Sequence, residues 1–71
     1  MIQPTARKTK RILDALLQGR ALTVGTALTE YGVYALSQEC GRLRKLGWPI
    51  SDDWRTVSEG VKVKVYWMMP L

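Results

Sequence analysis

With 71 residues, 46% of them hydrophobic, the chain can form one domain with a small core, which excludes a disordered tail and leaves little volume for a substrate pocket. It has no histidine and a single cysteine, Cys40, which excludes an internal disulfide and a zinc site built from thiolates and imidazoles. The formal net charge of +5 favours a polyanionic partner, and the basic excess lies in the first twenty residues and around residues 42–45.

A first helix is predicted to begin near Thr9, after a basic N-terminal arm at residues 1–8. Gly19 can take the left-handed conformation just past the end of this helix. Four apolar residues recur at helical spacing and form the face predicted to be buried: Ile12, Leu13, Leu16 and Leu17.

A second helix is predicted from Thr23, which suits the N-cap position because its hydroxyl can accept from a free amide of the first turn. Gly25 weakens this helix, and Gly32 ends it. A third helix then begins within about three residues, so the two helices must cross. The apolar stripe of the second helix is expected to contain Val24, Ala27, Leu28 and Tyr31.

The third helix lies in residues 31–50, which read YGVYALSQECGRLRKLGWPI. At 100° per residue, one side is apolar and is predicted to be buried, with Cys40 as a small buried hydrophobe: Val33, Leu36, Cys40 and Leu43. The other side offers hydrogen-bond donors to solvent: Tyr34, Gln38, Gly41, Arg42 and Lys45. A short turn followed by such a helix is typical of a helix-turn-helix, which presents its second helix to DNA.

A β-hairpin is predicted after Gly47, because Trp48-Pro49 cannot extend the helix. Its strands are residues 50–57 and 61–68, joined by a turn that contains Gly60. The facing of the second strand stays open. One side carries Val61, Val63, Val65 and Trp67, and the other carries Lys62, Lys64, Tyr66 and Met68.

The order of three helices and a hairpin resembles the winged helix-turn-helix domain, an α+β fold that is mainly α. More narrowly, the chain is similar to a family of short winged helix-turn-helix domains of bacteriophages and prophages. The residues that carry this resemblance are Thr23, Tyr31-Gly32, Leu43-Arg44, Gly47, Ile50 and Tyr66. It covers roughly residues 12–68, and we therefore expect a winged domain over residues 9–71.

The resemblance implies binding to double-stranded DNA, and the pattern of donors on the third helix supports it independently. Glutamine suits adenine and arginine suits guanine in the major groove. The expected base contacts are Gln38, Arg42, Ser37 and Tyr34. The expected backbone contacts are Arg7, Lys8, Arg44, Lys45, Lys62 and Lys64. A merely solvated helix face is the alternative for the first group, and solubilising charges on an edge strand are the alternative for the wing lysines.

Catalysis is not expected, because Asp52 and Asp53 point to opposite faces of a strand and no third metal ligand is evident. We likewise expect no cofactor, metal or small-molecule substrate. The apolar segments are too short or too charged to span a bilayer, and nothing resembles an export signal. The expected location is the cytoplasm of a bacterial host cell.

Two functional classes stay open. The first is a sequence-specific phage or prophage DNA-binding protein, acting as a transcriptional regulator or an excisionase-like factor. The second is a protein-binding winged-helix module, such as a phage inhibitor of a host protein. Five large apolar residues carry more surface than a small core can easily bury: Trp48, Trp54, Trp67, Met68 and Met69. Some of this surface could remain exposed and contact another copy of the chain, in a homodimer or in an array on DNA.

Overall fold

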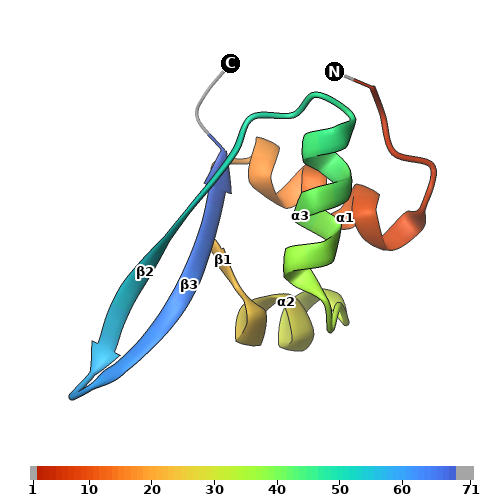
Figure 1. Cartoon of the computed structure of the whole chain (residues 1–71). Coiled ribbons are helices and arrows are strands. Elements are labelled where there is room, and N and C mark those ends of the chain that lie inside the picture. The colour runs from red at the N-terminus through yellow and green to blue at the C-terminus, as the bar shows by residue number, and fades with distance from the viewer. Residues whose placement is uncertain (1, 69–71) are drawn as a thin grey trace.

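The computed structural model describes residues 2–68 (Figure 1). Three helices are followed by a long hairpin, as predicted, and a short strand precedes the second helix. The elements are α1 (Arg7–Leu17), β1 (Leu22–Thr23), α2 (Val24–Tyr31), α3 (Leu36–Lys45), β2 (Ile50–Ser58) and β3 (Val61–Met68). Strand β1 was not predicted, because two residues are too few for a recognisable alternation.

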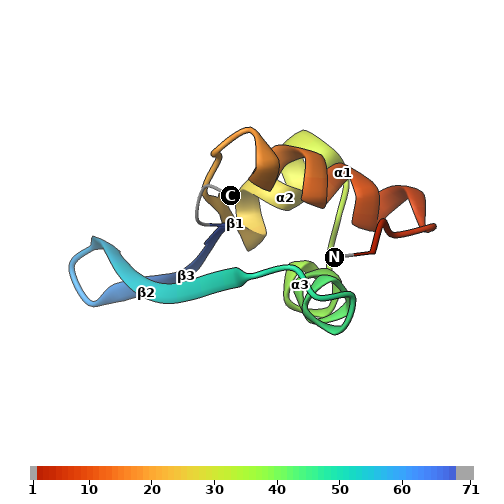
Figure 2. The ribbon, with the colours of Figure 1, turned by 90° about the horizontal axis from the view of Figure 1, so that it is seen from above.

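The hairpin of β2 and β3, called the wing below, extends away from the helices and makes the domain elongated, with extents of 39 × 24 × 19 Å. Seen from above, α3 and the wing lie along one side of the molecule, with α1 and α2 behind them (Figure 2).

The three strands form an antiparallel sheet in the order β1-β3-β2. Strand β1 pairs only with Tyr66 and Val65, whereas β2 pairs along the whole of β3, from Ile50 opposite Met68 to Ser58 opposite Val61. Tyr66 and Met68 belong to the core, so the side of β3 that carries the lysines faces the helices at its base. This resolves the facing of β3, although Val65 is also buried.

Helix α1 begins at Arg7, two residues earlier than expected, so Arg7 and Lys8 lie in its first turn. The burial of Ile12, Leu13 and Leu16 is confirmed. The prediction for Leu17 was wrong, since this side chain is 47% exposed. It is the last helical residue and lies about 100° around the axis from Leu16, at the edge of the buried stripe.

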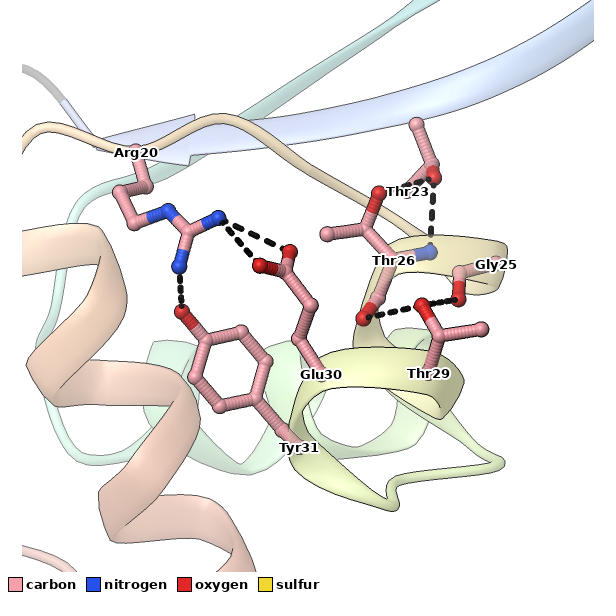
Figure 3. A network of polar contacts seen from close by, with 7 residues as sticks. All are labelled: Arg20, Thr23, Gly25, Thr26, Thr29, Glu30 and Tyr31. Carbon is pink, nitrogen blue, oxygen red and sulfur yellow. Dashed lines mark hydrogen bonds and ion pairs between the residues drawn. The ribbon is translucent and has the colours of Figure 1, made fainter.

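Helix α2 begins as predicted at the Thr23 N-cap, whose hydroxyl accepts from the Thr26 amide at 3.2 Å (Figure 3). Gly32 ends it with φ of 67°. The predicted burial of Val24 and Leu28 was wrong, since they are 49% and 40% exposed. This short helix lies across the beginning of α3 (Figure 1). Of its residues only Ala27 is buried, so Val24 and Leu28 on either side of Ala27 stay exposed.

Arg20, in the loop after α1, holds α2 in place (Figure 3). Its guanidinium donates to both oxygens of Glu30, at 2.9 and 2.8 Å, and also to the Tyr31 hydroxyl. The charge also lies over the Tyr31 ring, 5.5 Å from its centre. All three side chains are partly exposed, so this contact adds orientation more than stability.

The core joins one face of α1 and one face of α3 to the base of the sheet. The predicted burial of Val33, Leu36 and Leu43 is confirmed. Of the large apolar residues, Trp48 and Met68 are buried, Trp67 is half-buried and Trp54 is 60% exposed, while Met69 lies outside the described residues. The Trp48 indole N–H donates to the Ile2 carbonyl at 2.8 Å, and the Ile2 amide donates to the Leu46 carbonyl at 2.9 Å. The segment before α1 is thus tied to the end of α3.

Leu43→Ala should lower the free energy of unfolding by about 2 to 5 kcal/mol, because Leu43 is completely buried between the helices. Leu17→Ala removes the same atoms from a half-exposed position and should cost about 1 kcal/mol or less. Urea denaturation of both variants measures the difference. Equal losses at the two positions would contradict this core.

Candidate nucleic-acid interface

Helix α3 turns its apolar face inward and its polar face outward, as its periodicity predicted. Leu36, Cys40 and Leu43 are buried, and Gly41 is half-buried on the outer side. The exposed residues are Ser37, Gln38, Arg42, Arg44 and Lys45. Tyr34, in the turn before the helix, is 77% exposed. The predicted base-contact residues therefore lie on one continuous open surface of α3 and the turn that leads into it.

Glu39 is a buried residue of α3 whose burial was not predicted from the sequence. Its carboxylate accepts a hydrogen bond from the hydroxyl of Thr9, which is also buried, and so links α3 to α1. Arg42 lies 3.5 Å from the other Glu39 oxygen and remains 62% exposed. A carboxylate side chain on a helix is usually exposed to solvent. The only sequence signal for burial of Glu39 is its spacing, three residues after Leu36 and four before Leu43.

Arg44 connects the end of α3 to the wing. Its Nε and Nη2 donate to the Ile50 carbonyl at 3.1 and 2.9 Å, and Nη2 also donates to Asp52 Oδ2 at 2.5 Å. Lys64 Nζ, on β3, lies 3.6 Å from the other Asp52 oxygen. Two residues predicted to contact the DNA backbone are thus already paired with the same carboxylate.

The pKa of Asp52 lies below its usual value, chiefly because Arg44 donates a hydrogen bond to the carboxylate. Desolvation opposes this shift, while the positive charges of Lys64 and Arg44 add to it. The shared carboxylate therefore stays ionised and holds both cations beside α3.

Beyond Asp52, the side of the wing that faces the helices carries Trp54, Lys64 and Lys62. Trp54 lies directly across from Lys64, and Lys64 Nζ is 5.9 Å from the centre of the Trp54 ring and 5.7 Å from that of Tyr66. Lys62 follows toward the tip and is exposed. The wing thus presents basic and aromatic groups on the side that also bears the core contacts of Tyr66.

Positive charge also flanks the last turns of α3 on the side of α1. Arg7 and Lys8 are exposed in the first turn of α1. An open cavity of about 450 Å³ lies between the segment before α1 and the last turns of α3, with Arg42 and Lys45 in its lining. Basic groups therefore border α3 from α1, from its own end and from the wing.

Cys40 packs in the core as predicted, and burial raises the pKa of its thiol to about 12. Asp52 is engaged with Arg44 and Lys64, whereas Asp53 accepts from the Trp54 amide at 2.8 Å. Within residues 2–68 no three potential ligand side chains come together as a metal site. No helix in that part of the chain has the length and apolar character needed to cross a membrane.

A family model described as a winged helix-turn-helix domain matches residues 7–70. This match spans all the helices and strands described above, and the chain belongs to that family. Neither the curated proteins nor the solved structures gave a significant match.

Asp52→Asn should destabilise the domain near neutral pH but not in strong acid. Because the pKa of Asp52 is lowered on folding, its contribution is fully present above the unfolded value of about 4 and disappears as pH falls through the lower folded value. The difference in melting temperature between the parent and the variant should therefore shrink below about pH 4. A difference that does not change with pH would contradict the ion pairs of Asp52.

Proposed function

We propose that this protein binds double-stranded DNA, with α3 in the major groove and the wing beside the flanking phosphates. The observation that carries the proposal is that α3, whose outer side bears exposed hydrogen-bond donors, and the wing, which carries Lys62 and Lys64, lie along the same side of the molecule (Figure 2). A helix fits the major groove, where each base pair shows a distinct pattern of donors and acceptors. Membership of the winged helix-turn-helix family supports the same partner.

Base recognition is assigned to Gln38 and Arg42, with Ser37 and Tyr34 as secondary contacts. All four are exposed on or just before α3. Gln38 pairs with an adenine edge and Arg42 with a guanine edge. Half-buried Gly41 lies between them, and nothing within 4 Å occupies the space where its side chain would be, so this part of the helix can approach the bases closely.

The six cations assigned to the DNA backbone fall into two groups: four have no ion-pair partner among residues 2–68, and two are paired with Asp52. Arg7, Lys8, Lys45 and Lys62 are exposed cations without an ion-pair partner among residues 2–68, and they supply the phosphate contacts. Arg44 and Lys64 must share their charge between Asp52 and a phosphate. Their main role in this proposal is to set the position of the wing.

We further propose that the protein is a phage or prophage regulator, either of transcription or of excision, and that it binds DNA without catalysing a reaction. The resemblance to short phage domains supports the first statement. The second is supported by the contacts of the two adjacent acids, since Asp52 is engaged by Arg44 and Lys64 and Asp53 accepts from the Trp54 amide. A protein-binding role for the same fold is favoured by the exposure of Trp54 and Val57, each 60%.

Gln38→Ala and Arg42→Ala should each reduce discrimination between a selected duplex and its single-base variants. A bidentate base contact supplies about 1 to 3 kcal/mol of discrimination, so each loss should be roughly five- to 150-fold. Lys62→Ala is the matched control, since it should weaken all duplexes alike and lower the slope of log affinity against log salt by about 0.9. Fluorescence anisotropy titrations at several salt concentrations measure both effects.

Discrimination that survives both alanine substitutions would refute the assignment of base contacts. Weak binding to every duplex, together with tight capture of a protein partner lost in Trp54→Ala, would favour the protein-binding role instead.

Asp52→Asn should tighten binding to duplexes of any sequence and steepen its salt dependence. The change removes the negative charge that Arg44 and Lys64 share, so each can neutralise a phosphate. The amide oxygen of asparagine can still accept the Arg44 hydrogen bond that positions the wing. The same titrations test this effect, with Asp14→Asn on the opposite side of the molecule as a control of equal charge. Unchanged affinity for unrelated sequences would show that these cations stay away from the DNA.

A further inference from the structure

We propose that a second copy of this chain pairs with the open edge of β2, in an antiparallel register centred on Trp54. The inference concerns the main-chain edge of β2 and not the side chains assigned to DNA, and it does not depend on DNA binding. In the described part of the chain, β2 is an outer strand of the sheet and pairs only with β3. It runs for nine residues, and most of it projects beyond the helices (Figure 1).

Up to the register shift after Thr56, the hydrogen-bonding groups on the open edge belong to the even-numbered residues of β2. The Trp54 amide donates to the side chain of Asp53, and the Ile50 carbonyl accepts from Arg44, so neither group is directed at β3. In an antiparallel ladder the amide and carbonyl of one residue point to the same side, and successive residues alternate. Asp52, Trp54 and Thr56 therefore have their main-chain groups on the open edge, where the Trp54 amide exchanges its hydrogen bond to Asp53 for one to the partner strand.

The side chains around Trp54 select one register for that partner. Two identical strands related by a two-fold axis at Trp54 place Asp53 of each copy directly opposite Arg55 of the other. Opposite charges in such cross-strand pairs stabilise a sheet, and facing aromatic rings add to this. Asp53 and Arg55 are both exposed, and neither has an ion-pair partner within residues 2–68.

Neighbouring registers lose this complementarity. A two-fold axis at Asp53 places the two Asp53 carboxylates opposite each other, and an axis at Arg55 does the same with the two guanidinium groups. Like charges that face each other directly are destabilising. The sequence Asp53-Trp54-Arg55 is thus self-complementary only when it is centred on its tryptophan.

The other open edge of the wing behaves differently. Strand β1 covers β3 only at Val65 and Tyr66, so the outer half of β3 is also unpaired on that side. Its side chains there alternate between valine and lysine, and a two-fold axis at Lys62, Val63 or Lys64 places a lysine opposite another lysine. Edge lysines are a common protection against unwanted strand pairing. The charges therefore disfavour association through β3 and favour it through β2.

Sedimentation equilibrium of the full chain without DNA, from low micromolar to millimolar concentration, tests the proposal. The parent should form a dimer as concentration rises. Arg55→Asp and Asp53→Arg should each weaken dimerisation by about tenfold or more, because each puts like charges opposite each other. An equimolar mixture of the two variants should recover the dimer, since every Asp–Arg pair is restored between unlike copies.

Arg11→Asp and Asp14→Arg are the matched controls, because they change the net charge equally on the exposed side of α1. Each alone should dimerise like the parent, and mixing them should give no further gain. Circular dichroism of each variant verifies that the domain is folded. A parent that stays monomeric at every concentration, or folded edge variants that dimerise like the parent, would overturn the proposal. The proposal would also be overturned if an equimolar mixture of Arg55→Asp and Asp53→Arg failed to recover the dimer.

Discussion

The hydrogen bonds of Arg44 fix the relation between the helix and the wing on which the proposed interface depends. A two-stranded hairpin is only marginally stable alone, and most of this one lies beyond the core. Arg44 binds both the Ile50 carbonyl, where β2 begins, and the Asp52 carboxylate two residues later. Since Asp52 also attracts Lys64 on β3, a single side chain from α3 orients both strands.

Much of the fold could be predicted because its determinants are local. The glycines after each helix and in the hairpin turn, at positions 19, 32, 47 and 60, all have positive φ, as tight chain reversals require. The burial of Leu36, Cys40 and Leu43 follows from helical periodicity alone. The errors concern Leu17, Val24 and Leu28. These residues fit a local apolar pattern, but no neighbouring element packs over them, so they stay exposed.

The candidate site was predictable only in part, for the same reason. Exposure of Gln38 and Arg42 follows from the helix itself, whereas the pairing of Arg44 with Asp52 depends on where the hairpin returns in space. The buried Glu39 is similar, because its partner Thr9 lies thirty residues earlier on another helix. Contacts between distant segments decide which basic residues are free for DNA, and the sequence pattern does not contain them.

The most direct test of the account is an NMR titration that maps where a duplex, selected from random sequences, contacts the domain. If α3 and the wing bind DNA, the amide signals of residues 37–45 and of Lys62 shift together, while those of Asp14 and Gln18 on the outer side of α1 stay in place. Shifts confined to the outer side of α1, or to the wing without α3, would contradict recognition by this helix.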